Sequence, residues 1–584
     1  MSKVAANDKQ QVSLTTLSLF AVIIGVVTGL GAIFLRMLIA AIHNLFFLGT
    51  FSLDYNANDP TVPGPYGPLV ILAPVIGGLI VLFIVRRFAP EAKGHGVPEV
   101  MDAIYYHGGV IRPVVVVIKS LASALSIGSG ASVGREGPII QIGAGIGSVL
   151  GQVFKLRSWQ VITLVGAGAG AGIAATFNTP LGAVMFAIEL MLPEFSARTL
   201  LPVVLATGTA TYMGRLAFGM EPAFMVASYQ RPELFVPLSV DILPLYVLFG
   251  LIAGLGSWVF IKTLYLVEDF FDDWEFNPYL KNITAMTSLG ILFYVLMLTT
   301  GMYHTAGVGY ASIQAILTGQ ISAPAFLMLL FVLKLLATSI SLGGGASGGV
   351  FSPSLLLGAA LGGAFGSLMS MAFPFMGFSP IIFALIGMAA IVGGSTGAVM
   401  TSIMMLFEMT GDYTITAPAI IAVVVAVGVR SGLMSTDIYT TKLARRGHFI
   451  PRGLRSHMFA IRIARDVMEP VVCVVNEADV KHSGKIAKSN LDQRSFAVVM
   501  KGRSIVGIVQ VDTESNNRPI GPILSPVGVV RDTNFLQTAM AHMADRNLIA
   551  ALVIPEKKLA HPENVVGVLT RGAIAETVMR DFRT

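Results

Sequence analysis

SIGSGASVGREGPIIQIGAGIG, residues 126–147, returns 215 residues later as SLGGGASGGVFSPSLLLGAALG, residues 341–362. Aligned without a gap, the two segments share ten identical residues in 22 positions. The tetrapeptide GAVM at 182–185 recurs at 397–400 with the same offset. Membrane helices rich in glycine and alanine can look alike by chance, but an ungapped repeat that extends to a second motif favours two related halves.

The composition is that of a chain embedded largely in lipid. Of its 584 residues, 54% are hydrophobic and 12% are charged, whereas soluble domains carry about 25% charged residues. The mean hydropathy is +0.75, and the 62 glycines suit helices that approach closely in a membrane. The lone Cys473 excludes an intrachain disulfide. Basic loops at the membrane explain the net charge of +6 better than a nucleic-acid partner does.

Residues 13–447 are expected to form an all-α domain that crosses the membrane many times, in halves of roughly 13–230 and 231–447. The run 335–407 holds 73 residues without Asp, Glu, Lys or Arg, which at ~20 residues per crossing must enter the bilayer several times. Glycines and prolines interrupt it, and such breaks need surrounding protein or a water-filled cavity. The pattern therefore predicts short, broken helices. Other charge-poor runs lie near 13–35, 68–85, 113–133, 158–188, 242–261, 282–300 and 414–429.

Both ends of the chain are expected to lie in the cytoplasm. Residues 1–12 are polar, and the apolar run after them is too long for a cleaved signal peptide. By the positive-inside rule, a basic segment after the last apolar run marks a cytoplasmic exit; its charges are Lys442, Arg445, Arg446, Arg452 and Arg455. Residues 448–584 read as a linker and a small cytoplasmic α/β domain. The β-branched runs VVCVV, FAVVM, IVGIVQV, ALVIP and VVGVL alternate there with helix-like stretches such as NFLQTAMAHMADR.

Three glycine-rich loops each end in a proline and precede an apolar run. They are GHGVP at 94–98, GREGP at 134–138 and GVFSP at 349–353. Proline is favourable in the first turn of a helix, and a helix N-terminus presents unpaired N–H groups and a partial positive charge. Three such termini aimed at one point would bind a small anion without a fixed cationic side chain, weakly enough for the ion to leave.

Glu136 is the ionisable residue inside the second loop, and such a residue at membrane depth is a functional candidate. Its carboxylate would compete with the anion for the same N–H groups. It could therefore act as a gate that protonation removes. The alternative is a simple ion pair with Arg135, although adjacent residues rarely face each other.

These motifs resemble the three selectivity motifs of the CLC family of chloride channels and proton/chloride antiporters. GSGASVGREGP at 128–138, GHGVP and GGVFSP carry the resemblance, which covers essentially the whole membrane part. Further matches are NTPLGAVMFAIELM at 178–191, LFEMTGDY at 406–413 and IYTTKLARR at 438–446. The resemblance implies an inverted-repeat fold of about eighteen helices per subunit, a homodimer, and one pore for chloride in each subunit.

The resemblance assigns the gate to the second loop. Glu136 matches the gating glutamate of the family, and the rest of this anion-loop motif consists of Gly134, Arg135, Gly137 and Pro138.

The chloride-binding residues are likewise carried over from the resemblance. Val350 and Phe351 match the residues whose backbone amides hold the central chloride. Tyr439 matches a tyrosine whose hydroxyl helps to coordinate it, the alternative being a tyrosine of the interfacial belt. His95 and Gly96 lie in the remaining loop, where the family usually has serine in place of His95. Imidazole can donate a hydrogen bond to an anion, but it is larger and can become charged.

A second departure from the family bears on proton coupling. Proton-coupled members usually carry an internal glutamate directly after the Glu of NxPLxxxxFxxE, whereas Leu190 follows Glu189 here. Leucine cannot relay a proton, and at ~100° per helical residue Glu189 points away from that position. We therefore expect chloride to pass a glutamate-gated pore in a channel-like manner without strict proton coupling. The alternative is a proton/chloride antiporter with a non-glutamate internal path.

The C-terminal domain resembles a CBS pair, a regulatory domain often appended to this family. ARDVMEPVVCVV at 464–475 and ENVVGVLTRGAIAETV at 563–578 match the beginning and the end of the repeat. Some CBS pairs bind adenine nucleotides through an Asp that reaches the ribose, but Arg571, Gly572 and Ala573 follow the VLT motif here. Nucleotide binding and a purely structural, dimerising domain both remain open.

Other classes of function fit the sequence less well. The apolar region has no HExxH, no suitable GxSxG and no carboxylate pair, so we expect neither an enzyme nor a required cofactor or metal. A membrane sensor would not need paired anion loops. The absence of long insertions within the membrane part suggests a bacterial inner membrane.

We predict that His95→Ser changes the chloride/nitrate permeability ratio, because flanking glycines let the loop approach an ion closely. Flux of each anion from liposomes measures the ratio. If both the ratio and the response to acid stay unchanged, the ring is turned away and only its backbone matters.

Overall fold

The computed structural model describes two compact units, Met1–Pro451 and Arg452–Thr584. The described residues are 11–226, 242–374, 378–448, 450, 463–480, 495–502, 504–512, 518–534, 536–555, 558 and 561–581. Most of the predicted N-terminal segment and the predicted basic residues Arg452 and Arg455 lie outside them. Each unit is described by itself.

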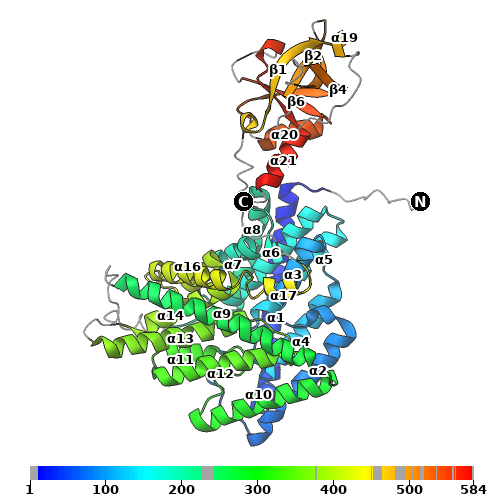
Figure 1. Ribbon diagram of the computed structural model, residues 1–584. Helices are drawn as coiled ribbons and strands as arrows, with labels where there is room; N and C mark the ends of the chain where they lie inside the picture. The colour runs from blue at the N-terminus through cyan, green and yellow to red at the C-terminus, as the bar shows by residue number, and fades with distance from the viewer. Residues whose placement is uncertain are drawn as a thin grey trace. The chain divides into compact units, whose positions relative to one another are not determined.

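The first unit is a bundle of helices, as predicted (Figure 1). Eight helical segments among the described residues are long and apolar enough to cross a membrane. The charge-free run is divided into the end of α12, the whole of α13 and α14, and most of α15, which confirms the prediction of broken helices. The helices are α1 (Leu14–His43), α2 (Leu72–Phe88), α3 (Val97–Tyr106), α4 (Pro113–Gly128), α5 (Glu136–Val153), α6 (Ser158–Phe177), α7 (Pro180–Phe186), α8 (Ala197–Phe218), α9 (Leu243–Asp273), α10 (Pro278–Thr300), α11 (Tyr310–Leu317), α12 (Pro324–Gly343), α13 (Phe351–Ala372), α14 (Pro380–Thr396), α15 (Val399–Thr410), α16 (Thr416–Leu433) and α17 (Thr440–Arg445).

Two reciprocal backbone hydrogen bonds join the two halves. The Gly134 N–H donates to the Gly349 carbonyl at 2.7 Å, and the Gly349 N–H donates to the Gly134 carbonyl at 2.7 Å. These residues are 215 positions apart, the offset of the sequence repeat. A contact in which one position meets its own equivalent is the mark of a two-fold relation. The pair therefore lies on the approximate two-fold axis of an inverted repeat.

Serine contacts around this pair obey the same relation. The Ser132 N–H donates to Ser341 Oγ at 2.9 Å, and the Ser347 N–H donates to Ser126 Oγ at 3.0 Å. Each residue of the first bond maps onto one of the second by the offset of 215. All four serines are buried, so these bonds satisfy backbone groups that water does not reach.

Two buried lysines, also 215 positions apart, hold the loops in front of α3 and α11. Lys119 Nζ donates to the carbonyls of Ala92 at 2.9 Å and Gly94 at 2.7 Å. Lys334 Nζ donates to the carbonyls of Thr305 at 3.2 Å and Gly307 at 3.0 Å. Both lysines are fully enclosed. A buried ammonium is tolerated only when it is well hydrogen-bonded, so each lysine ties its loop firmly in place.

Glycines allow the closest helix packing in both halves. A Cβ on Gly143 of α5 would lie 2.1 Å from the carbonyl oxygen of Gly168 in α6. A Cβ on Gly358 of α13 would lie 2.2 Å from the carbonyl oxygen of Gly387 in α14. Small residues at such contacts let helix backbones approach in a membrane protein. The abundance of glycine in the sequence thus has a direct structural use.

The chain enters and leaves the first unit on one face, which we call the exit face. The Gln160 amide bonds the backbone of Val12 at the start of α1. Ser158, at the start of the same helix α6, lies next to Gly108: a Cβ added to Gly108 would be 3.5 Å from the Ser158 Oγ. Asp102 joins His107 of that loop to His448 after α17, at 3.3 and 2.5 Å. Arg36, 22 residues beyond Leu14 in α1, lies about 33 Å away along the helix, toward the opposite face.

The second unit contains two copies of a strand–helix–strand–strand arrangement. β1 runs parallel to β2 and β2 antiparallel to β3, and the relations of β5, β6 and β7 are the same. The sheet order is β4-β3-β2-β1-β7-β6-β5. The elements are β1 (Glu469–Asn476), α19 (Glu477–Val480), β2 (Ser495–Lys501), β3 (Ser504–Asp512), β4 (Arg518–Leu524), β5 (Val527–Arg531), α20 (Leu536–Asp545), β6 (Ala550–Ile554), β7 (Gly567–Thr570) and α21 (Arg571–Asp581).

All five predicted β-branched runs are strands and the predicted helix is α20, so the small α/β domain is confirmed. Sequence analysis did not find β4 and β5. Their sequences, RPIGPIL and VGVVR, contain proline or glycine, which usually indicate turns. Two copies of one arrangement support a CBS pair, which stays a prediction.

We predict that Gly358→Ala destabilises the first unit, because the new methyl group meets backbone atoms of α14 that cannot rotate away. Overpacking of this kind costs about 1–3 kcal/mol. The midpoint of thermal unfolding of the purified protein in detergent measures the loss.

The matched control is Gly428→Ala in α16, where no atom lies within 4 Å of the added Cβ. We expect no destabilisation there, because alanine is intrinsically the better helix former. Equal effects of the two substitutions would contradict the role given to close packing.

Candidate functional site

The three glycine-rich loops meet, as the sequence predicted. The loop before α5 is bonded to the loop before α13 through Gly134 and Gly349. The loop before α3 joins them, because the Gly348 N–H donates to the Gly94 carbonyl at 3.3 Å. A Cβ on Gly137 would lie 2.0 Å from the His95 carbonyl oxygen, so only glycine allows this approach. Three helix N-termini are thereby fixed around one place.

Glu136 lies against the N-terminus of α13. Its carboxylate is buried, with 1% of the residue exposed, and accepts hydrogen bonds from three donors. These are the Ser352 hydroxyl, the Ser352 N–H at 3.3 Å and the Tyr310 hydroxyl at 2.5 Å. Ser352 belongs to the first turn of α13. The carboxylate therefore uses an amide that a bound anion would also use, the competition expected of a gate.

Tyr310 is a site residue that sequence analysis missed. It begins α11 and is buried, and its hydroxyl bonds both Glu136 and Ser352 Oγ, the latter at 2.9 Å. The signal that could have found it is the repeat, because Tyr310 is 215 positions after His95 and Gly309 is 215 positions after Gly94. The two residues hold equivalent places in the two halves.

Arg135 does not pair with Glu136 among the described contacts. Its guanidinium carbon lies 5.2 Å from the centre of the Tyr310 ring, over its face. A cation over an aromatic face is attracted by the ring electrons. The alternative of a simple Arg135–Glu136 ion pair is therefore wrong.

A cavity of about 490 Å³ approaches Glu136 from the face opposite the exit face. Its lining includes Arg36, Arg135, Phe177, Asn178, Tyr310 and Gln314. Tyr310 lines the cavity and bonds Glu136, so this side chain separates the cavity from the carboxylate. The lining carries two cations, Arg36 and Arg135, and two acids, Asp59 and Glu221, so its formal charges balance; Arg135 is the cation that lies over the Tyr310 ring.

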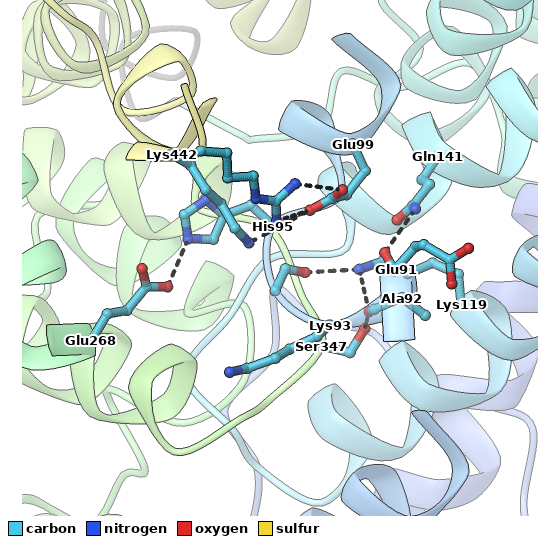
Figure 2. Close-up of polar contacts among 12 residues, drawn as sticks. Glu91, Ala92, Lys93, His95, Glu99, Lys119, Gln141, Glu268, Ser347 and Lys442 are labelled. Atoms are coloured by element: carbon cyan, nitrogen blue, oxygen red, sulfur yellow. Dashed lines mark hydrogen bonds and ion pairs between the residues drawn. The ribbon is translucent and has the colours of Figure 1, made fainter. Parts of the chain in front are cut away.

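His95 lies in the first loop and is fully enclosed, and neither ring nitrogen has a hydrogen-bond partner in the part of the chain that the structure describes. Its Nε2 is 3.6 Å from Oε1 of Glu268, near the end of α9 (Figure 2). The Tyr265 ring lies edge-on to it, with centroids 6.4 Å apart. Gly96 precedes α3 with φ 84°, a left-handed conformation that favours glycine. The ring is thus turned toward a carboxylate that sequence analysis did not identify.

The remaining predicted chloride ligands lie at two helix starts. Val350 and Phe351 are the cap and the first residue of α13, both buried next to Ser352. Tyr439 caps α17 and is buried, and Asp437 Oδ1 accepts its N–H at 2.9 Å. The preceding carbonyl, of Ile438, accepts from the Tyr265 hydroxyl at 2.5 Å. The roles of these residues in binding chloride stay predictions.

Leu190 is half-buried, in the π-helical turn Ala187–Met191 that follows α7. The assumption of an α-helix at this point was therefore wrong, because a π-turn rotates each residue differently. Glu189 is still unsuited to replace a relay at position 190. Its carboxylate accepts from the Met400 N–H at 3.1 Å and from the Thr401 N–H at 2.9 Å, so it caps α15.

Comparisons with known proteins agree with this geometry. The family described as "Voltage gated chloride channel" matches residues 77–431. The chain is 33% identical over 384 residues to the H(+)/Cl(-) exchange transporter ClcA of Vibrio campbellii, covering 65% of this chain and 80% of that protein. A structure of a slow cyanobacterial Cl-/H+ antiporter is similar with a TM-score of 0.65 and 26% identity, covering 75% of this chain and 99% of the other. A eukaryotic CLC transporter shares the fold over 96% of this chain and 98% of its own, at 20% identity and a TM-score of 0.60.

We predict that Tyr310→Phe speeds anion flux at neutral pH, because the Glu136 carboxylate loses one of its three donors. A hydrogen bond to a charged group contributes about 1.5–3 kcal/mol. The carboxylate should therefore leave the α13 N-terminus at least about tenfold more often. Chloride efflux from liposomes measures the change.

The control is Tyr413→Phe, at a residue that is 75% exposed. Its flux should match that of the unmodified protein. A Tyr310→Phe protein that folds normally but is no faster would show that the hydroxyl does not hold the gate closed.

Proposed function

The chain belongs to the voltage gated chloride channel family, and we propose that it exchanges protons for chloride or a similar small anion across the membrane. The observation that carries the proposal is the position of the Glu136 carboxylate on the N-terminus of α13. One group of donors serves either the carboxylate or an anion. Protonation of Glu136 and occupation by an anion are therefore linked.

The choice of exchange over a channel revises the interpretation that the sequence favoured. Leu190 removes the usual internal glutamate, which pointed to a channel. The curated relative and the cyanobacterial structure are described as exchangers, and both are similar over most of their own length. They favour the alternative, an antiporter whose internal proton path does not use position 190.

The linkage works by charge. While Glu136 is ionised, a second negative charge near Ser352 is repelled, and the donors are already used. A proton on Glu136 removes the charge and weakens its hold on the α13 N-terminus. An anion can then take the amide and hydroxyl donors, and when it leaves, the protonated carboxyl group releases its proton and returns to these donors as a carboxylate. Each cycle thus moves an anion one way and a proton the other.

The surrounding parts serve the same cycle. The cavity beside Tyr310, whose lining includes Arg135, is the route by which anions and protons reach Glu136 from the face opposite the exit face. We place the exit face in the cytoplasm, because Lys442, Arg445 and Arg446 lie there. A bacterial inner membrane and a homodimer are part of the same proposal.

The test is a flux experiment in which a chloride gradient is imposed across liposomes containing the full chain. With the membrane potential clamped, chloride leaving the vesicles should drive protons inward against their own gradient. A pH electrode and a chloride electrode record both ions together. Rapid chloride flux without uphill proton movement would overturn exchange and restore the channel-like interpretation.

We predict that Glu136→Gln keeps chloride flux but abolishes proton movement, because the amide fills the same space without carrying a proton. The pH dependence of chloride flux that arises from this gate should disappear as well. The matched control is Glu194→Gln, at an exposed acid of the same half, which should leave both fluxes unchanged. Proton pumping by the Glu136→Gln protein would exclude Glu136 as the proton carrier.

A further inference from the structure

A second acid–base pair lies on the exit-face side of the three loops. His95 is fully enclosed, and Glu268, whose side chain is 17% exposed, approaches its Nε2 to 3.6 Å (Figure 2). The neighbouring acids of α9 are at the surface, where Asp269 pairs with Arg445 and Asp272 with Lys93. Glu268 therefore stands between solvent at the exit face and an enclosed imidazole.

We propose that His95 and Glu268 form the internal proton-transfer pair of this protein, a part that Leu190 cannot perform. The inference rests on the proposed exchange. Glu268 takes a proton from water at the exit face and gives it to Nε2 of the imidazole. One O–H bond breaks and one N–H bond forms, leaving a carboxylate beside an imidazolium. The imidazolium then releases its Nδ1 proton toward the pore, which leaves a neutral ring with its proton on Nε2; rotation about the Cβ–Cγ bond then exchanges the two ring edges before the next proton enters.

No hydrogen bond locks the ring in one tautomer. Among the described residues neither nitrogen has a hydrogen-bond partner, and Nε2 has only the 3.6 Å contact with the Glu268 carboxylate. A buried imidazole is normally hydrogen-bonded, and an unpaired one needs an explanation. Transfer of a proton to and from both nitrogens is such an explanation, whereas a histidine that only supports the loop would be bonded in one orientation.

The other ionisable groups around His95 are committed elsewhere. On α4, Lys119 donates to the Ala92 and Gly94 carbonyls. On α17, Arg446 and Lys442 pair with Glu99 of α3, at 2.7 and 3.8 Å. On α9, the Tyr265 hydroxyl donates to the Ile438 carbonyl. Glu268 is the carboxylate that faces the ring among the described residues, so it is the one that can exchange a proton with it.

The repeat supports the same assignment. His95 and Tyr310 occupy equivalent positions, each after a glycine in a loop held by a buried lysine. Tyr310 faces Glu136 on the side of the cavity, and His95 faces Glu268 on the side of the exit face. Each half thus places one side chain that can bind or release a proton next to one carboxylate. An exchanger needs such a group on each side of its anion site.

The test measures protons moved per chloride in liposomes that contain the full chain. Glu268→Gln keeps the shape of the side chain but cannot carry a proton, and we expect this ratio to fall at least about tenfold. Asp269→Asn, the next residue on α9, is the matched control and should keep the ratio. Glu268→Asp retains a carboxyl group and should recover part of the proton/chloride ratio. His95→Ser is the second variant and should also lower the number of protons moved per chloride.

The outcomes separate this inference from the proposed function. If the unmodified protein drives no protons uphill, exchange itself fails. If it does, and Glu268→Gln and His95→Ser proteins of normal thermal stability keep the same ratio, the pair does not carry protons. Proton and chloride fluxes that fall together, with the ratio unchanged, would assign the pair a structural role and would equally overturn the inference.

Discussion

The structure depends on one pair of backbone hydrogen bonds, exchanged between Gly134 and Gly349 where the two halves meet. Neither residue carries a side chain, so two loops can approach until their amides and carbonyls bond directly. Gly137 extends the same close approach to the third loop, at the His95 carbonyl. Because these loops start α3, α5 and α13, the contact decides where three helix N-termini point. The proposed anion site and the proposed gate follow from that placement.

Among the described residues, no fixed cation contacts the Glu136 carboxylate directly. Amide and hydroxyl donors at the start of α13 hold the carboxylate, and the same donors suit an anion. Donors of this kind neutralise less charge than a lysine would, so an ion can leave again. The buried lysines serve a different purpose. Lys119 and Lys334 bind backbone carbonyls of the loops, which holds the loops in place.

Three carboxylates of the first unit each bond a helix N-terminus that is distant in sequence. Glu136 rests on the α13 N-terminus and Glu189 caps α15, while Glu408 caps α7 through the Leu181 and Gly182 N–H groups. Glu189 and Glu408 therefore stabilise helix starts in the opposite half, and their oxygens are occupied. Glu136 differs because its partner Tyr310 also borders a cavity.

The sequence by itself determined the repeat, the membrane character, the broken helices of 335–407, the three loops and Glu136. These features are local, since hydropathy, glycine and proline act within a few residues, and the family resemblance rests on contiguous motifs. Only the tertiary structure decided the partners. Tyr310 lies 174 residues from Glu136, Glu268 is remote in sequence from His95, and the π-turn at Glu189 has no local signature. Which side chain faces which carboxylate depends on how distant helices pack, and no short-range pattern encodes that.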